Sequence, residues 1–315
     1  MFKSILSLFS GIGTFLLGMK LVSLNLQKVA GGRIERLFSS ISSSYVKSVG
    51  VGVGSAAILQ SSSATTVLLV SLVNSGIVTL IQATCIIMGA NVGTTFTAFL
   101  ISFNYLPIGE IFAFLTFLGV MLIMVEKGNR LNSLGWIIGS LGLMFIGLNI
   151  IKLSALELST YPSFNGLFSS LNSPFILLLL GMIFTAIIQS SSALTGIVIT
   201  FAHLGIMPVT ATFYLIMGGN VGSCATAFLA SGGGNINAKR TAFINLLFNA
   251  IGVIIFLPFV ILFGKKAVDL FKHTSFSVIV AYFHVFFNLI TTLILLPFCR
   301  KLTELSILFL PDKKE

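Results

Sequence analysis

Long apolar stretches, each with at most one charged residue, follow one another along almost the whole chain. A helix rises about 1.5 Å per residue, so roughly 20 apolar residues are enough to cross the hydrocarbon core of a bilayer. The candidate membrane segments are 5–26, 46–73, 77–103, 107–125, 134–152, 174–202, 206–231, 241–263 and 277–298. We therefore expect an all-α integral membrane protein with about 8–10 membrane segments.

The composition excludes the other classes of protein. Only 8% of the 315 residues are charged and 56% are hydrophobic, whereas soluble domains carry roughly 25% charged residues. The 18 Lys and Arg residues outnumber 8 Asp and Glu residues. They are scattered over short loops, as expected beside anionic lipid, so we expect no nucleic-acid partner. Cys85, Cys224 and Cys299 show neither metal-site spacing nor a pairing signal, and we expect buried, unpaired side chains.

Two sets of motifs recur at a constant offset of 129 residues. Gln60-Ser61-Ser62-Ser63-Ala64 recurs as Gln189-Ser190-Ser191-Ser192-Ala193, and Met88-Gly89-x-Asn91-Val92-Gly93 recurs as Met217-Gly218-x-Asn220-Val221-Gly222. A constant offset without gaps indicates a duplicated unit. A weaker similarity, at an offset of 39, relates Asn245 and Asn249 to His284 and Asn288. The predicted division is a first repeat over 1–130, a second over 131–263, and an extra C-terminal span with a short cytoplasmic tail over 264–315.

The basic loops predict that the two repeats are inverted relative to each other. Loops 27–47 and 126–132 both carry Lys and Arg, which places both on the cytoplasmic side. Three apolar segments separate these loops, so at least one segment must enter and leave on the same side. The span 5–26 then ends inside, whereas its copy, 134–152, starts inside. We therefore expect inverted repeats, each containing broken or re-entrant hairpin helices.

The Gln-Ser-Ser-Ser clusters are candidate binding sites inside the bilayer. The first cluster lies 13 or 14 residues from Lys47 and from Asn74, so each helical arm is only about 20 Å long and does not span a core of about 30 Å. Unwound backbone at that depth must line a cavity or be buried in protein. A half-helix beginning at Ser offers free N–H groups to an oxyanion, while hydroxyl and carbonyl oxygens suit a hard cation such as sodium. For a lone Ser, helix packing would be the better interpretation.

These paired motifs resemble the signature of the sodium-dependent phosphate cotransporter family, which comprises the type II sodium–phosphate transporters and their bacterial relatives. The resemblance covers about residues 5–298. It implies a multi-pass protein of the cell membrane that couples sodium ions to the movement of inorganic phosphate by alternating access. It also implies no cofactor beyond the coupling sodium ions and no transition metal.

By the same resemblance, each binding role is assigned to residues of the two motifs. The phosphate-binding residues would be Ser61, Ser62, Asn91, Ser190, Ser191 and Asn220. The sodium-binding residues would be Gln60, Ser63, Thr66, Thr94, Thr95, Gln189, Ser192, Thr195 and Ser223.

The chain also departs from the family pattern. Many relatives carry His and an acidic residue in the first half, where residues 113–119 have neither, so the number of sodium ions stays open. We expect a short form without the PhoU-like C-terminal domain of many bacterial relatives. The alternatives are a sodium-dependent transporter or exporter of another oxyanion, or an anion channel. An enzyme is not expected, because the few acids fall mostly in loops.

Several single residues and the assembly have two interpretations. Glu110 is interpreted as a helix-start residue, with a sodium or proton role as the alternative. His203 and His284 are interpreted as structural rather than as proton carriers, and Lys20 and Lys152 as residues that snorkel from span ends. A homodimer is compatible with the sequence, which does not determine the oligomeric state.

Overall fold

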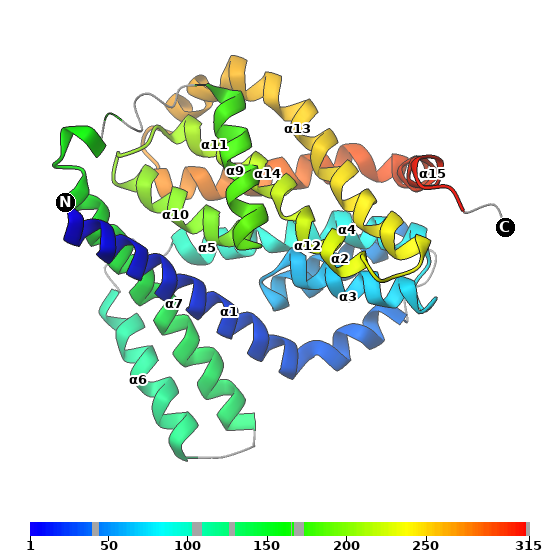
Figure 1. The fold of residues 1–315 in the computed structure, drawn as a ribbon, viewed down its shortest axis with the longest axis horizontal. Coiled ribbons are helices and arrows are strands. Elements are labelled where there is room, and N and C mark those ends of the chain that lie inside the picture. Colours follow the sequence, from blue (N-terminus) through cyan, green and yellow to red (C-terminus); the bar gives the residue numbers. More distant parts are fainter. Residues whose placement is uncertain (40–43, 103–108, 126–129, 165, 167–172, 313–315) are drawn as a thin grey trace.

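The computed structural model describes residues 1–39, 44–102, 109–125, 130–164, 166 and 173–312 (Figure 1). These residues form helices and their connections, with no strand among them. The helices of the first half are α1 (Phe2–Ser39), α2 (Tyr45–Leu59), α3 (Ser62–Asn74), α4 (Leu80–Thr94), α5 (Phe96–Ser102) and α6 (Gly109–Val125). They are followed by α7 (Arg130–Leu158), α9 (Pro174–Ile188), α10 (Ser191–His203), α11 (Val209–Gly222), α12 (Cys224–Ser231), α13 (Ile236–Leu270), α14 (Phe276–Leu295), η2 (Leu296–Phe298) and α15 (Cys299–Phe309).

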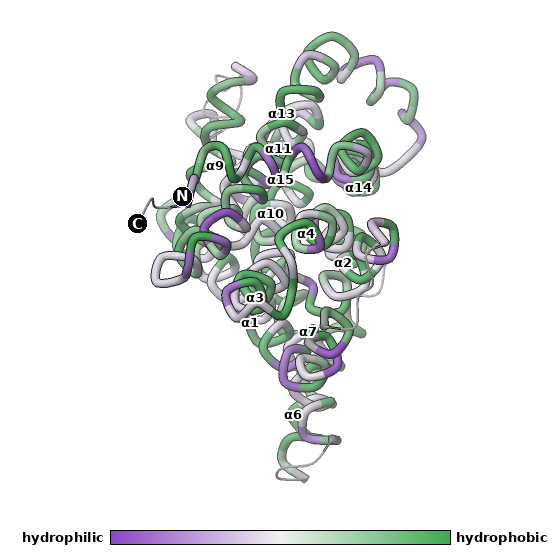
Figure 2. The backbone as a smooth tube through the Cα atoms, turned by 90° about the vertical axis from the view of Figure 1, so that its right-hand side faces the viewer, coloured by the Kyte–Doolittle hydropathy of each residue, from purple (hydrophilic) through white to green (hydrophobic). Residues whose placement is uncertain are grey.

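Six helical stretches in the described part are long and apolar enough to cross a membrane. They are Phe2–Phe38, Leu80–Ser102, Leu131–Leu158, Val209–Ser231, Ile236–Leu270 and Phe276–Phe309. Figure 2 shows hydrophobic residues along α13 and hydrophilic ones in the connection that follows it toward α14. The chain is therefore an all-helical, multi-pass membrane protein. The expected eight to ten segments are reached only by counting shorter helices, because 46–73 and 174–202 are each broken into two helices of 13 and 15 residues.

The helices recur at the same offset as the motifs. Adding 129 to both bounds of α2 gives the bounds of α9, and the same holds for α3 and α10. The helices α2 and α9 both begin after a serine N-cap, Ser44 and Ser173, but their first turns are stabilised differently. The Ser44 side chain accepts a hydrogen bond from Lys47 N at the start of α2, whereas α9 has Pro174 in its first turn. The helix pattern and its serine N-caps are thus repeated, whereas the hydrogen bond to Ser44 and the proline at the start of α9 each occur in one half only.

Glycines hold corresponding helix pairs in close contact, α2 against α4 and α9 against α11. A Cβ atom added at Gly89 would overlap the carbonyl oxygen of Val49, and one added at Gly218 would overlap that of Leu178. Val49 and Leu178 are themselves 129 residues apart. Small residues let two helices pack backbone to backbone in a membrane, where apolar side chains alone give little driving force.

The N-terminal half of α1 packs against the C-terminal half of α7, and the two helices run in opposite directions (Figure 1). A Cβ atom at Gly18 would meet the backbone of Met144, and one at Gly147 would meet that of Phe15. Nearer the N-terminus, Ser154 Oγ donates to Ser7 Oγ over 2.8 Å. Residue numbers rise along one helix as they fall along the other, which defines an antiparallel pair. The contacts are also reciprocal, because Gly147 and Met144 correspond to Gly18 and Phe15 at the offset of 129.

The C-terminal helices close the assembly around the buried α4 and α11. α14 packs against α4, α5, α10 and α11, whereas α6 packs chiefly on α7. The α6–α7 hairpin projects from the rest of the molecule (Figures 1 and 2). The main hydrophobic core lies among α10, α11, α14 and their neighbours, and includes Ile101, Met217 and Phe287.

The cysteines differ in part from the expectation. Cys85 of α4 and Cys299 of α15 form a disulfide, which corrects the prediction that all three cysteines are unpaired. The two are 214 residues apart in the sequence, so their spacing carries no pairing signal. Folding brings them together because α15 returns to pack on α4. Cys224 is buried and free, as expected.

Candidate functional site

The first Gln-Ser-Ser-Ser cluster lies at a break between two helices. Gln60 ends α2 in the left-handed conformation, with φ 51° and ψ 28°. Ser61 is extended, and its Oγ accepts a hydrogen bond from Ala64 N at the start of α3. A single left-handed residue followed by a single extended one is therefore enough to end one helix and begin the next.

The second cluster repeats this geometry 129 residues later. Gln189 ends α9 with φ 59° and ψ 27°, and Ser190 caps α10 through a bond from Ala193 N to its Oγ. Among the described residues, Gln60 and Gln189 are the only non-glycine residues with positive φ. A left-handed conformation is unfavourable for a residue with a Cβ atom, and such strain clusters at functional sites.

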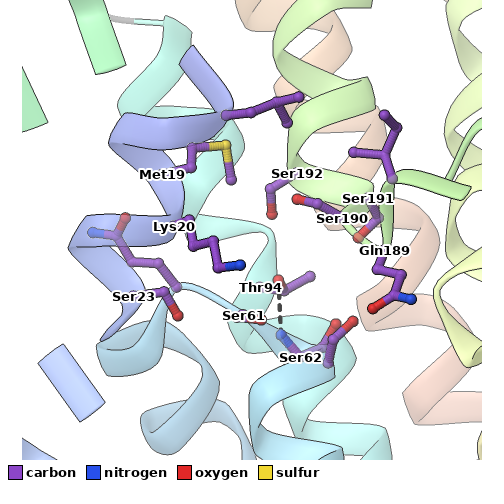
Figure 3. A pocket seen from close by; sticks show the side chains of 14 residues that line it. Met19, Lys20, Ser23, Ser61, Ser62, Thr94, Gln189, Ser190, Ser191 and Ser192 are labelled. Carbon is purple, nitrogen blue, oxygen red and sulfur yellow. Dashed lines mark hydrogen bonds between the residues drawn. The ribbon is translucent and has the colours of Figure 1, made fainter. Parts of the chain in front are cut away.

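Both breaks face one cavity of about 370 Å³ (Figure 3). Nine of the residues predicted from the sequence line it: Gln60, Ser61, Ser62, Ser63, Thr94, Gln189, Ser190, Ser191 and Ser192. Two segments far apart in the sequence thus supply one polar wall each. Leu16, Met19, Lys20 and Ser23 of α1 also line the cavity, together with Ile188.

The cavity offers hydrogen-bond donors that the protein itself leaves free. One backbone donor at the first break is already used, because Ser62 N donates to Thr94 Oγ1 over 3.3 Å. The backbone N–H groups of Ser63, Ser191 and Ser192 have no acceptor among the described residues. They sit in the first turns of α3 and α10, where the helix dipole is positive. Two helix N-termini that face one space form a favourable environment for an anion.

The other six predicted site residues lie outside the cavity lining. Asn91, Asn220, Thr66, Thr95, Thr195 and Ser223 are all buried. The Nδ2 atom of Asn91 donates to Asn245 Oδ1 over 3.4 Å, and that of Asn220 donates to Asn288 Oδ1 over 2.8 Å. The two asparagines therefore link α4 to α13 and α11 to α14. Thr195 Oγ1 and Ser223 Oγ donate to backbone carbonyl oxygens of their own segments.

The helices α13 and α14 each bond to an asparagine of one repeat, but not through positions that are equivalent at the offset of 39, where Asn245 corresponds to His284 and Asn288 to Asn249. Each helix contributes one asparagine to the Asn–Asn bonds just described, Asn245 from α13 and Asn288 from α14. Neither ring nitrogen of His284, which is 1% exposed, has a partner among the described residues. The side chain of Glu110 lies outside the described part.

The two polar residues of α1 that line the cavity, Lys20 and Ser23, were not predicted as site residues. Lys20 was expected to snorkel from the end of a span, but α1 continues to Ser39, so Lys20 lies halfway along a 38-residue helix and borders the cavity. Ser23 Oγ donates to Leu59 O over 3.2 Å, which holds α1 against the last turn of α2. The sequence did hold a signal that could have identified Lys20, which is the single charged residue within the apolar stretch 5–26.

Comparison with known proteins identifies related sequences along almost the whole chain. The sequence model of a family described as Na+/Pi-cotransporter matches residues 14–153 and again 156–294. The protein named "Putative inorganic phosphate export protein YjbB" from Escherichia coli K12 is 31% identical over 313 residues, which cover 99% of this chain and 57% of YjbB. This chain thus spans little more than half the length of that relative.

Two further relatives have different lengths and names. "Uncharacterized protein YqeW" of Bacillus subtilis 168 is 30% identical over 300 residues, 95% of this chain and 96% of YqeW. "Sodium-dependent phosphate transport protein 2A" of Rattus norvegicus is 25% identical over 171 residues, 51% of this chain and 26% of the rat protein. No solved structure gives a significant match. The family description and two of these names describe transport or export rather than catalysis.

Proposed function

Because the chain belongs to the Na+/Pi-cotransporter family, we propose that it is a secondary transporter that moves inorganic phosphate across the cell membrane together with sodium ions. The observation that carries the proposal is the shared cavity, which both Gln-Ser-Ser-Ser breaks line. Donors from two helix N-termini, together with serine hydroxyls, match an oxyanion with several acceptor oxygens.

Electrostatics supports coupling between the two ligands. Phosphate carries between one and two negative charges near neutral pH, and burying such a charge without compensation costs several kcal/mol. A sodium ion bound beside phosphate offsets that cost, and each ligand then favours binding of the other. The side-chain oxygens of Gln60 and Gln189, at the ends of α2 and α9, are hard ligands of the kind sodium prefers. We propose that sodium binds in the cavity through the side-chain oxygens of these two glutamines.

The proposed mechanism is alternating access between two inverted repeats. The antiparallel, reciprocal packing of α1 on α7 supports a two-fold relation between the copies. The 15 residues of α2, and of α9, reach only about 22 Å, which supports re-entrant hairpins rather than full spans. We propose that repeats 1–130 and 131–263 rock around the cavity, with 264–315 as an added segment.

The direction of net transport follows from the gradients. The name of YjbB refers to export, and a symporter of this kind runs outward when the phosphate gradient exceeds the sodium driving force. Phosphate export is therefore our second candidate function. The membrane potential contributes about 2.3 kcal/mol per net charge moved per 100 mV, so the direction depends on how many sodium ions accompany each phosphate.

The test is uptake of radiolabelled phosphate into proteoliposomes that contain the purified chain. We expect uptake with an inward sodium gradient and none when choline replaces sodium. Ser62→Ala or Ser191→Ala removes a cavity hydroxyl, and we expect phosphate affinity to fall roughly ten- to a hundredfold, since a hydrogen bond to a charged group contributes about 1.5–3 kcal/mol.

The matched control is Ser71→Ala. Ser71 lies on α3 like Ser62, but its side chain is exposed and does not line this cavity. It should transport like the unchanged protein. Equal uptake in sodium and in choline would exclude sodium coupling, and unchanged affinity in both cavity variants would remove the serines from the phosphate site.

A further inference from the structure

The cavity carries a fixed positive charge that neither serine cluster supplies. Lys20 extends from α1 into the cavity toward Thr94 and the two serine clusters (Figure 3). Among the described residues it has neither a hydrogen-bond acceptor nor a carboxylate partner. No acidic side chain of the described part lines the cavity. The positive charge of the Lys20 ammonium group, which points toward the two breaks, is therefore not balanced by a negative charge of the described residues.

This charge is supplied by one repeat only. The position that corresponds to Lys20 in the second repeat is Asn149, and no residue of α7 lines the cavity. The serine clusters are paired across the cavity, whereas the lysine is single. The net charge of the empty site is thus set by one residue of α1, which can be changed without altering either helix break.

We propose that Lys20 is a binding residue for the transported anion and takes the place of one coupling cation. This inference rests on the function proposed above. The positive ends of α3 and α10 and the Lys20 ammonium all favour the same sign of ligand. A built-in cation offsets part of the phosphate charge before any sodium binds. Phosphate therefore binds measurably without sodium, and sodium increases an affinity that already exists.

The experiment measures binding of inorganic phosphate to the purified chain over a series of sodium concentrations, with choline keeping the ionic strength constant. For Lys20→Gln we expect phosphate affinity to fall at least about tenfold without sodium and by a smaller factor in saturating sodium, because added sodium then compensates for the lost charge. Lys20→Arg keeps the charge and should keep most of the sodium-independent binding.

The matched control is Lys152→Gln, which removes a lysine from α7, a helix that contributes no residue to the cavity lining. It should bind phosphate like the unchanged chain. If the unchanged chain and Lys20→Gln bind phosphate equally at every sodium concentration, the role of Lys20 is overturned while the proposed function stands. If the unchanged chain binds no phosphate at any sodium concentration, both are overturned.

A second measurement does not depend on the folding of a variant. Phosphate should slow the acylation of Lys20 in the unchanged chain by an amine-reactive reagent, followed by mass spectrometry, while the exposed Lys301 of α15 reacts at the same rate throughout. Equal rates at Lys20 with and without saturating phosphate would overturn the proposal. Protection at Lys20 alone supports it.

Discussion

At the scale of single residues, the two breaks depend on glutamines in an unfavourable conformation. A left-handed residue with a Cβ atom costs roughly 1–2 kcal/mol, and glycine would avoid that cost. Both positions nevertheless carry Gln, with φ 51° and 59° and a side chain that borders the cavity. Because the two breaks share this geometry, we propose that the glutamine side chain itself contributes to ligand binding.

This leads to opposite expectations for stability and for transport. In Gln189→Gly, relief of the left-handed strain is offset by about 0.5–1 kcal/mol of extra chain entropy in the unfolded state. We therefore expect the thermal unfolding temperature in detergent to stay the same or rise slightly, while sodium-dependent phosphate transport falls. Gln189→Val should lower the unfolding temperature, because a β-branched residue is strained at φ 59°.

Equal transport by Gln189→Gly and the unchanged chain would mean that the glutamine side chain binds neither ligand. A large loss of stability in the glycine variant would mean that the side chain supports the fold instead. Gln60, in the equivalent position of the first repeat, offers an independent repetition of the same pair of measurements.

At the scale of helices, a glycine-mediated contact holds α2 against α4 beside the first break. α2 carries Gly50, Gly52 and Gly54, but only Gly52 is in contact with α4, where an added Cβ would overlap Ile86 O. Nothing lies within 4 Å of a Cβ placed at Gly50 or Gly54. α4 in turn carries Thr94, whose Oγ1 accepts from Ser62 N at the edge of the cavity. Close packing of α2 on α4 is therefore part of what places Thr94 beside the start of α3 at the first break.

Two single alanine substitutions separate this contact from helix propensity. Gly89→Ala places a methyl group against the backbone of α2 at Val49, so the helices must separate. We expect the free energy of unfolding to fall by about 1–3 kcal/mol, as at other overpacked sites, and transport to be reduced. Gly54→Ala has open space around its Cβ and gains up to about 1 kcal/mol of helix propensity. Thermal unfolding in detergent would compare the two, and equal stability would show that the close approach is not required.

At the scale of the whole molecule, the repeat and both breaks could be predicted from the sequence. Four consecutive polar residues within an apolar stretch cannot all face one neighbouring helix, so Gln60–Ser63 had to interrupt it. The environment of Asn91 could not be predicted, because it depends on which helix packs beside α4. Three residues before Thr94, it faces α13 and bonds Asn245 instead of lining the cavity. Lys20 was misplaced because α1 extends beyond the apolar stretch that defined the predicted span.

Contacts between distant segments could not be predicted from sequence patterns either, because they depend on which helices pack together in the folded chain. The Cys85–Cys299 disulfide joins residues that are 214 positions apart. Packing of α14 against α4, α5, α10 and α11 is likewise a contact between distant segments. The offset of 39 between α13 and α14 indicated only that the two helices are similar, and not where α14 packs.

The proposed inverted arrangement of the repeats makes a prediction about the two sides of the membrane. Ser75 follows α3 and Leu204 follows α10, at equivalent positions of the two repeats. If the antiparallel packing of α1 on α7 reflects a two-fold axis in the membrane plane, equivalent connections lie on opposite faces. In vesicles of defined orientation, an impermeant maleimide added outside should label only one of Ser75→Cys and Leu204→Cys, and inverted vesicles should reverse the result.

The native cysteines leave this labelling experiment a low background. Cys85 and Cys299 are joined in a disulfide, and Cys224 is buried, so the unchanged chain serves as the blank. A permeant maleimide should label both variants from either side, which checks that each new thiol is reactive. Labelling of both variants from the same face would mean that the repeats are parallel. The serine-lined cavity could then still bind phosphate. However, two parallel repeats cannot open the cavity to each side of the membrane in turn by exchanging their conformations. Transport would then require a different motion.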